Sequence, residues 1–314
     1  MKTFDDFHWI VRSAGERTTD LCVHLIEREY TTSPVTVLRE APFSKAVEET
    51  LRQGHACGKR WTVCLDADVL LFGNGMKRLL RLIQKDKYKA FCYQALIYDK
   101  LIPIRRPAGI HVYDNGRALM GIEHIPANGN ALRPESFMTS QMAEAGHKTL
   151  QTPFLIGLHD FEQYYKDLFR KSILHSNKHI GVLDTCEAYW RKQKHSDADY
   201  AVALDGCLAG KLIEENLKVD KNFWKDKTDE YLERFGLEEK SELEISDEGI
   251  GQLKRQFHNR HIINTVQRYK NPDHRDIYFR FEDHEGRRQG RLKERISIFG
   301  NRLYHKGKQL KEKV

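Results

Sequence analysis

Apolar residues in the first hundred positions recur with two different periods. Short runs rich in Val, Ile, Leu and aromatic residues are typical of buried strands, and they alternate with stretches whose apolar positions lie three or four residues apart, as in amphipathic helices. The pattern predicts strands over residues 7–13, 33–40, 61–71 and 88–98, with helices over residues 18–30, 44–58 and 75–86 between them. Strands that alternate with helices indicate an α/β fold with a mostly parallel, Rossmann-like sheet flanked by crossover helices.

The second half of the chain is less regular. Residues 101–129 are rich in Gly, Pro, His and Arg and predict loops or an irregular hairpin, followed by a short helix near residues 133–147. An apolar run then ends at His159-Asp160 and leads into a long helix, for which Asp160 and Gln163 form a plausible capping pair. A further helix is expected over residues 184–193.

The composition changes after about residue 213 to charged helical stretches, and we place a domain boundary there. The sequence thus predicts a catalytic domain over 1–215 and a charged, mainly helical extension over 216–314. The net charge of the chain is +7, but Lys221–Ile250 contains 5 basic and 10 acidic residues, and Gly251–Val314 contains 17 basic and 7 acidic residues. The basic end can attract nucleic acid, anionic lipid or an anionic substrate, or form a solvated surface.

The absence of a signal-like or membrane-spanning stretch in this sequence, and its scattered cysteines, indicate the cellular compartment. The first residues carry acids where a secretory signal has a basic flank, and no window approaches the roughly 18 apolar residues of a membrane span. The six cysteines are scattered without a CxxC pair, as expected of reduced thiols. We therefore expect a cytoplasmic protein, with peripheral contact to an anionic inner membrane surface through the basic end as a further hypothesis.

One pair of acids stands out. In "WTVCLDADVLL", Asp66 and Asp68 end an apolar strand, and in an open α/β sheet ligands bind at the carboxyl ends of the strands. Two buried carboxylates need a positive partner, and their oxygens suit Mg²⁺ or Mn²⁺, which usually bind one or two carboxylates together with substrate phosphates. A second Asp-x-Asp, at Asp197 and Asp199, lies between helical stretches and is a weaker candidate.

The stretch "WTVCLDADVLLFGNG" resembles the Asp-x-Asp region of GT-A fold glycosyltransferases, which transfer sugars from nucleotide-diphosphate donors. "WIVRSAGERT" is similar to their first strand and nucleotide-facing turn, and "APFSKAVEETLRQG" to the helix before the acid strand, so the resemblance covers about residues 7–215. It implies that Asp66 contacts the donor nucleotide or ribose, that Asp66 and Asp68 lie at the metal, and that His159 is a further metal ligand. The other reading of His159 is a histidine packed at a helix start.

Basic and acidic residues on the first turn are candidates for nucleotide binding. A turn that leads into a helix presents backbone N–H groups to anions, so Arg12, Glu16 and Arg17 could contact base, ribose or phosphate. Arg17 could instead pair with a nearby acid. Lys45, at the start of the second helix, is a similar but weaker candidate.

An inverting transferase also needs a carboxylate base near the acceptor hydroxyl, and a retaining one does not. Asp160 and Glu162 are the nearest acids to the expected metal side, although Asp160 could simply cap its helix. Aromatic faces suit the apolar faces of sugar rings, so His111, Tyr113, Tyr164 and Tyr165 are candidates for a sugar-stacking wall, with helix packing as the other reading of Tyr164 and Tyr165.

The predicted function is metal-dependent transfer of a sugar from a nucleotide sugar to a saccharide or lipid-linked acceptor, as in cell-surface polysaccharide synthesis. Three alternatives stay open: a haloacid-dehalogenase-type phosphatase with Asp66 as nucleophile, a nucleotidyltransferase, and a nucleic-acid-binding protein that uses the basic C-terminus. The phosphatase lacks its further motifs, the nucleotidyltransferase its Gly-rich phosphate loop, and nucleic-acid binding leaves the acid pair unexplained.

Overall fold

The computed structural model describes residues 4, 6–85, 87–103, 105–127, 131, 133–213 and 225–259, all within one compact unit, Met1–Arg268. Residues 260–314, which carry most of the basic extension, lie outside the described part. The expected contacts of that extension with membrane or nucleic acid therefore concern residues that the structure does not describe.

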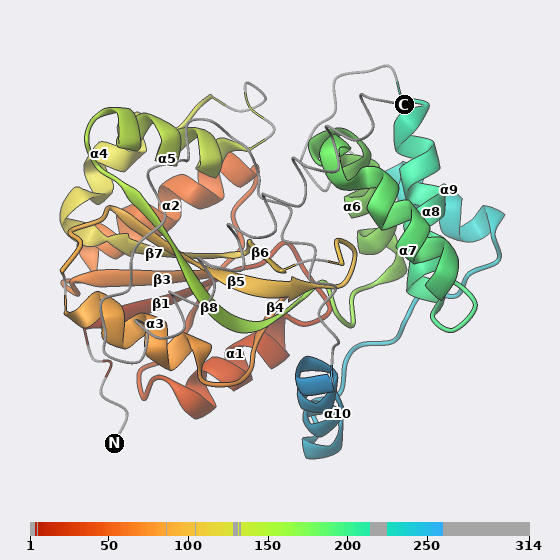
Figure 1. Ribbon diagram of the computed structural model, residues 1–314, viewed down its shortest axis with the longest axis horizontal. Coiled ribbons are helices and arrows are strands. Elements are labelled where there is room, and N and C mark those ends of the chain that lie inside the picture. Colours follow the sequence, from red (N-terminus) through yellow and green to blue (C-terminus); the bar gives the residue numbers. More distant parts are fainter. Residues whose placement is uncertain are drawn as a thin grey trace, which may run out of the picture. The chain divides into compact units, whose positions relative to one another are not determined.

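The centre of the fold is an eight-stranded sheet with the order β2-β1-β3-β7-β5-β8-β4, in which β6 pairs with β5 (Figure 1). The strands are β1 (Phe7–Arg12), β2 (Thr36–Leu38), β3 (Trp61–Asp66), β4 (Val69–Leu71), β5 (Cys92–Asp99), β6 (Arg105–Pro107), β7 (Ile110–Asp114) and β8 (Thr149–His159). The pairings set β1, β2, β3, β5 and β8 in one direction, and β4, β6 and β7 in the other. The α/β class is confirmed, and the sheet is mixed: among the described strands three pairings are parallel and four are antiparallel.

The stretch expected to form one strand over residues 61–71 forms two. After Asp66 the chain turns, and β4 pairs antiparallel with β8 instead of continuing β3 beside β1. The turn is held from both sides, because the Ala67 N–H donates to the Arg12 carbonyl at 2.9 Å and the Thr18 hydroxyl donates to the Ala67 carbonyl at 2.8 Å. The apolar pattern continues through the turn because β3 and β4 are both buried.

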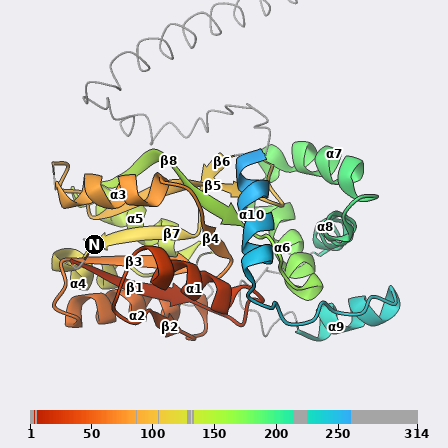
Figure 2. The same ribbon diagram turned by 90° about the horizontal axis from the view of Figure 1, so that it is seen from below.

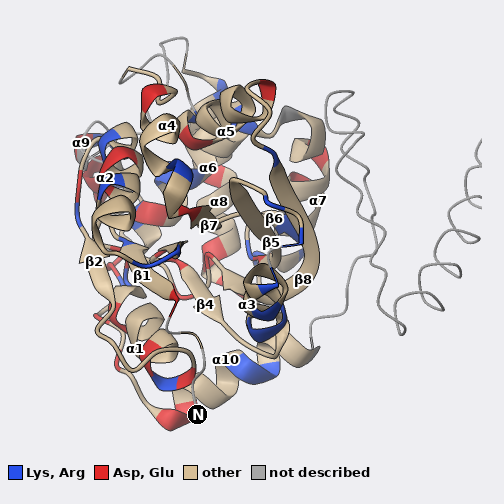
Figure 3. Cartoon of the chain, turned by 90° about the vertical axis from the view of Figure 1, so that its left-hand side faces the viewer, with Lys and Arg blue, Asp and Glu red and all other residues tan. Residues whose placement is uncertain are grey.

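Helices cover both faces of the sheet (Figure 1). One face carries α2 (Phe43–Ala56), α4 (Ala118–Glu123) and α5 (Pro134–Glu144), and the other carries α1 (Thr19–Glu29) and α3 (Gly75–Gln84). In α3 the buried residues are Met76, Leu79, Leu80 and Ile83, which is one face of a helix. Its outer face is basic (blue in Figure 3). This is the amphipathic pattern that the sequence predicts.

A second group of helices packs beside the sheet: α6 (Tyr165–Lys178), α7 (Leu183–Gln193), α8 (Ala198–Lys211) and α9 (Lys225–Arg234) (Figures 1 and 2). Single 3₁₀ turns, η1 (Asn115–Arg117) and η2 (Ile180–Val182), connect neighbouring elements. These helices share a core of their own, built around Trp190, Leu168 and Ile173. None of the helices in the described part of the chain has an apolar stretch long enough to cross a bilayer.

The described part of the extension packs on the rest of the fold. On α9, Tyr231 stacks on Phe169 of α6 with ring centroids 3.8 Å apart. On α10 (Asp247–Asn259), the Phe257 ring lies 6.1 Å from Phe72 and 5.7 Å from Tyr98, centroid to centroid. The boundary near residue 215 stays a prediction, and these contacts show that residues on both sides of it share packed interfaces.

Candidate metal and nucleotide site

Four polar residues end four strands that run in the same direction. Arg12 ends β1, Asp66 ends β3, Asp99 ends β5 and His159 ends β8. The carboxyl ends of parallel strands meet at one edge of a sheet, which is where open α/β sheets bind ligands. The topology therefore brings to one edge residues that are up to 147 positions apart in the chain.

The turn after β3 places Asp68 beside the end of β8. The Asp160 N–H donates to the Asp68 carbonyl at 3.2 Å, which continues the β4–β8 pairing by one step. The Gln163 amide donates to the Thr18 hydroxyl at 2.8 Å, and thereby fixes the side chain that binds the Ala67 carbonyl. Asp68 thus sits on a turn that is tied to β1, α1 and β8.

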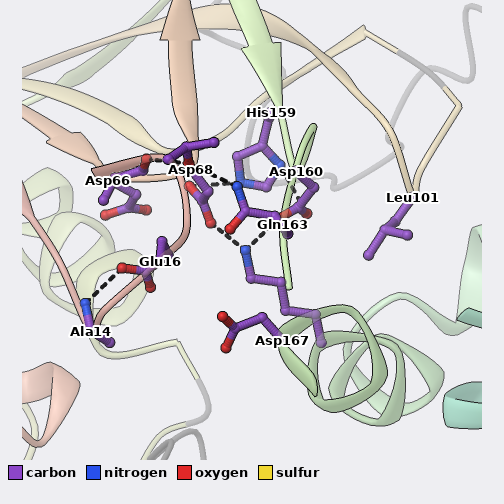
Figure 4. Close-up of polar contacts among 12 residues, drawn as sticks. Ala14, Glu16, Asp66, Asp68, Leu101, His159, Asp160, Gln163 and Asp167 are labelled. Atoms are coloured by element: carbon purple, nitrogen blue, oxygen red, sulfur yellow. Dashed lines mark hydrogen bonds and ion pairs between the residues drawn. The ribbon is translucent and has the colours of Figure 1, made fainter. Parts of the chain in front are cut away.

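Asp68, His159 and Asp160 form a buried group whose ligand atoms all lie within 4.8 Å of one another (Figure 4). His159 Nε2 lies 3.4 Å from Asp68 Oδ1, and His159 Nδ1 lies 3.2 Å from Asp160 Oδ2. Asp160 has a φ of 63°, a left-handed conformation that is uncommon for a residue other than glycine. This conformation occurs where strand β8 ends and its last side chains face Asp68.

Lys171, on α6, supplies the positive charge that meets this group. Its ammonium donates to Asp68 Oδ2 and to Asp160 Oδ1, so one cation bridges two carboxylates. Burial would lower the pKa of Lys171, but Asp160 and Asp68 raise it above its ordinary value. Burial would raise the pKa of Asp160, yet His159 and Lys171 hold it well below its usual range. The carboxylate of Asp160 is thereby stabilised in the ionised form.

The chemistry of the group fits a hard divalent cation. Asp68 Oδ1 and Asp160 Oδ2 are buried carboxylate oxygens with no hydrogen-bond donor among the described residues. His159 Nδ1 lies 2.9 Å from Asp99 Oδ2, and a carboxylate can only accept, so Nδ1 carries a proton. Burial would lower the pKa of His159, but Asp160, Asp68 and Asp99 hold it well above its ordinary value, so Nε2 is the nitrogen that would give up its proton to bind a cation. A carboxylate behind a ligating histidine is the usual support of such sites. Asp68, His159 Nε2 and Asp160 are the residues that would hold the ion.

Asp66 lies beside this group but faces a different cation (Figure 4). Arg12 Nε donates to Asp66 Oδ1 at 3.0 Å, and the same guanidinium binds both carboxylate oxygens of Glu135 at 2.8 and 3.1 Å. Burial raises the pKa of Asp66 and Arg12 opposes that shift. The side chain of Asp66 is 30% exposed and that of Arg12 is 4% exposed, so the carboxylate is the more accessible of the two groups to a ligand.

Glu135 joins several polar groups behind Arg12. Its carboxylate accepts from the Tyr113 hydroxyl and lies 3.1 Å from His111 Nδ1, and the rings of His111 and Tyr113 are stacked. Tyr113 is fully buried and His111 is 8% exposed. The expected sugar-stacking wall of His111 and Tyr113 is therefore wrong, because their faces pack on each other and their polar atoms position Glu135.

The remaining predicted nucleotide and catalytic residues are spread around this edge. Arg17 donates to Glu162 Oε2 at 3.1 Å, the pairing with an acid that the sequence left open, and to the Ser241 carbonyl at 2.6 Å. Glu16 accepts from the Ala14 N–H at 2.7 Å within its own turn (Figure 4). Lys45 is exposed on α2. Their roles toward a nucleotide stay predictions.

The expected cap of α6 by Asp160 and Gln163 is wrong. The helix begins at Tyr165, and Tyr164 at its N-cap makes no side-chain capping bond. Glu239, from the segment after α9, caps it instead, because its carboxylate accepts from the N–H groups of Tyr165 at 2.7 Å and Lys166 at 3.1 Å. Asp160 is therefore free of a capping role and belongs to the group around His159.

The acids of the second Asp-x-Asp, Asp197 and Asp199, bind groups within the protein. Asp197 accepts from the Asp199 N–H at 3.0 Å at the N-cap of α8, and Asp199 accepts from Lys100 and Lys240. Lys100 Nζ also lies 3.0 Å from Asp197. Each acid of this pair has lysine nearby and secures α8 against the loop after β5.

Sequence reasoning missed Asp99, Lys171 and Glu135. Asp99 ends an apolar strand, the same signal that identified Asp66, and it could have been found on that ground. Lys171 and Glu135 lie on helices, and no local pattern marks them. Only their packing against the sheet edge shows what they contact.

No family model and no curated protein matches the sequence of this chain. Solved structures with partial likeness include a glycosyltransferase involved in glycosylation of the major capsid of PBCV-1, at 9% identity over 49% of this chain and 94% of that one, with a TM-score of 0.35. A mannosyltransferase from Pyrobaculum calidifontis in complex with GDP-Man and Mn²⁺ shares 12% identity over 74% and 83%, with a TM-score of 0.37. A putative nucleotide-diphospho-sugar transferase from Desulfovibrio desulfuricans G20 shares 10% identity over 61% and 71%, with a TM-score of 0.28.

These neighbours are described as glycosyl- or nucleotide-sugar transferases, the class that the sequence resembles. All three TM-scores are below 0.5. The function of this chain is therefore inferred from the geometry of its own site.

Proposed function

We propose that this chain is a metal-dependent glycosyltransferase that moves a sugar from a nucleotide-diphosphate donor to a saccharide or lipid-linked acceptor. The observation that carries the proposal is the buried group Asp68, His159 and Asp160 at the carboxyl ends of the strands, with the more accessible Asp66 next to it. Carboxylate oxygens with one imidazole suit Mn²⁺ or Mg²⁺. A bound divalent ion would neutralise the negative charge that develops on a departing diphosphate.

In this proposal the residues divide into two neighbouring sets. Asp68, His159 and Asp160 hold the ion, with Asp99 fixing the imidazole from behind. Asp66 contacts the nucleotide or its ribose, and Arg12 and Glu135 hold Asp66 in place from the interior. The first turn, with Glu16 and Arg17, lies beside these sets and contacts the donor.

Glu162 is the better placed of the two candidate bases. Asp160 is fully buried and bound by Lys171, so its carboxylate is not available to an acceptor hydroxyl. The Glu162 side chain is 37% exposed and pairs with Arg17. An inverting reaction would use Glu162 to accept the proton of the acceptor hydroxyl. A retaining reaction would not need it, so the anomeric configuration of the product of the wild-type protein tests this assignment.

The test is a thermal-shift screen of UDP, GDP and their sugars with and without Mn²⁺, because ligands that bind the native state raise its melting temperature. We expect a shift that needs both nucleotide and Mn²⁺ in the wild type, and no such shift in Asp68→Ala. Asp197→Ala, in the other Asp-x-Asp, is the matched control and should respond like the wild type. Mn²⁺-dependent nucleotide binding that survives in Asp68→Ala would refute the proposed role.

The phosphatase alternative is separated by product analysis. A transferase releases UDP or GDP from a nucleotide sugar in the presence of acceptor, whereas a phosphatase releases phosphate from simple phosphate esters. Phosphate release that depends on Asp66, without release of a nucleotide, would favour the phosphatase.

A further inference from the structure

The ammonium of Lys171 occupies the position between two of the three residues that would bind a metal. It donates to Oδ2 of Asp68 and Oδ1 of Asp160, and its side chain is 12% exposed. The third residue of the group, His159, lies 3.4 Å from Asp68 and 3.2 Å from Asp160. The same two carboxylates are thus the partners of an internal cation and the candidate ligands of an external one.

Lys171 and a divalent ion would share the two carboxylates, because the ammonium holds Oδ2 of Asp68 and Oδ1 of Asp160 and the ion would bind the open oxygens, Oδ1 of Asp68 and Oδ2 of Asp160. An ammonium is a compact point charge, and a divalent ion on the other oxygens of the same carboxylates would lie close to it. Repulsion between like charges is strong in a buried site, because the effective dielectric constant there is far below that of water. Arg106 donates to Asp99 at 2.9 Å, and Asp99 accepts from His159 Nδ1, so this further cation is linked to the group through Asp99.

The four-carbon stem of Lys171 is flexible, so the ammonium can move without a change in α6. Glu16, on the turn after β1, lies close enough to attract the ammonium. A displaced Lys171 would therefore move toward the turn that we assign to the donor, where it can meet an anionic diphosphate.

We propose that Lys171 is a built-in competitor for the divalent cation, which holds Asp68 and Asp160 together until a cation displaces it. The inference rests on the metal site of the proposed function and adds a device that controls its loading. It explains how the buried carboxylates of Asp68 and Asp160 can lie side by side, because one ammonium bridges them. It also means that the ion is bound weakly until other ligands, such as the donor phosphates, are present to help displace Lys171.

The test compares wild type, Lys171→Met and Lys166→Met as full-length proteins in Mn²⁺ titrations without nucleotide, by calorimetry. Methionine keeps the length of the stem and removes the charge. We expect Lys171→Met to bind Mn²⁺ at least about tenfold more tightly, because the ion then meets two buried carboxylates that have lost their partner. The same variant should melt at a lower temperature without Mn²⁺ and recover with it. Lys166, which lies five residues earlier on α6 over the Tyr164 ring, is the control, and its replacement should leave the Mn²⁺ affinity and the melting temperature unchanged.

The outcomes separate this inference from the proposed function. If neither wild type nor Lys171→Met binds Mn²⁺, with or without UDP or GDP, the metal site itself is refuted. If both bind Mn²⁺ with equal affinity, or the variant binds more weakly, only the competition is refuted.

A second measurement uses the wild type alone and serves where Lys171→Met does not fold. An amine-reactive reagent followed by mass spectrometry reports how accessible each lysine is. Saturating Mn²⁺ should increase the labelling of Lys171 and leave that of Lys166 unchanged. Labelling of Lys171 that stays constant while Mn²⁺ binds would overturn the proposal.

Discussion

Asp99 Oδ2 lies 2.9 Å from His159 Nδ1, and this contact leaves Nε2 as the ring nitrogen that can bind a ligand. Burial would raise the pKa of Asp99, but Arg106 and His159 hold it below its ordinary value, so the acid is ionised and accepts from Nδ1. The other oxygen, Oδ1, accepts from the N–H groups of Leu101 and Ile102 at 2.9 and 2.8 Å. One side chain therefore orients the histidine and closes the loop after β5.

Asp99→Asn should weaken Mn²⁺ binding about 10- to 100-fold, the usual effect of removing a carboxylate behind a ligating histidine. The amide can still accept from the loop N–H groups but presents a donor to His159 Nδ1, which turns the imidazole away from its working tautomer. Calorimetric titration with Mn²⁺ measures the change. Asp114→Asn, in another strand-end acid that pairs with Arg117, is the control. Unchanged affinity in Asp99→Asn would remove Asp99 from the site.

Glu135→Gln should cost about 3–5 kcal/mol of the free energy of unfolding at pH 7, because it leaves the buried Arg12 without its two-oxygen partner. Urea unfolding measures this change. Glu48→Gln, which removes one acid of the exposed Glu48–Arg52 pair, should cost less than about 1 kcal/mol. A loss in Glu135→Gln no larger than in Glu48→Gln would contradict the role of Glu135.

The same glutamate predicts a pH dependence. Burial would raise the pKa of Glu135, but Arg12 and His111 lower it from 4.5 to about 2. Its stabilising contribution is therefore complete above pH 4.5 and is lost as the pH falls through about 2. The difference in unfolding free energy between wild type and Glu135→Gln should narrow over that interval. A difference that stays constant down to the lowest pH at which the protein folds would contradict the assignment.

Gly109→Ala should lower the free energy of unfolding by more than backbone strain alone would. Gly109 has a φ of +64°, and an added Cβ would lie 2.4 Å from Val69 Cγ2 and 3.3 Å from His159 Cδ2. Gly58 has a similar φ of +72° with nothing within 4 Å, so Gly58→Ala measures the strain alone. We expect Gly109→Ala to lose about 1–3 kcal/mol more than Gly58→Ala in thermal or urea unfolding. Equal losses would mean that the strand ends give way around the added methyl group.

Lys178→Met should stabilise the protein near neutral pH. Burial, followed by Arg133, Arg170 and Arg106, lowers the pKa of Lys178 from 10.5 to about 8. The charged form is therefore disfavoured in the native state below pH 8, and this penalty fades as the pH rises from 8 to 10.5. Allowing for partial exposure, we expect the variant to gain roughly 1–2 kcal/mol at pH 7. The gain over wild type should shrink toward pH 10.5, and a variant less stable at pH 7 would contradict the prediction.

Phe257→Ala tests whether α10 is part of the packed unit. Phe257 is 8% exposed against Phe72 and Tyr98, and its removal should cost about 3 kcal/mol if the helix stays docked in solution. Phe235, which is 52% exposed on the turn after α9, is the control and should cost less than about 1 kcal/mol. Urea unfolding measures both. A small effect for Phe257→Ala would place α10 outside the cooperative unit.

The sequence by itself determined the α/β class and singled out Asp66 and Asp68 as carboxylates in the third apolar run. Burial patterns are local, because a strand covered on both faces must be apolar and an amphipathic helix must repeat its apolar residues every three to four positions. The apolar run that contains Trp61–Asp66 and the helix Thr19–Glu29 could therefore be predicted from the local sequence. Asp66, Asp68 and His159 were found because polar residues at the end of an apolar strand are a local signal too.

The tertiary structure decided which of these residues share a site. The turn at Ala67 sends β4 to the far side of β8, and that pairing brings Asp68 to His159 and Asp160 while Asp66 stays with Arg12. Lys171 enters from α6, 103 residues after Asp68 in the chain, and Glu135 enters from α5, 123 residues after Arg12. Electrostatic interactions in a buried site depend on distance in space. The local sequence around Asp68 or Arg12 does not indicate which charged residue from elsewhere in the chain will pack beside it.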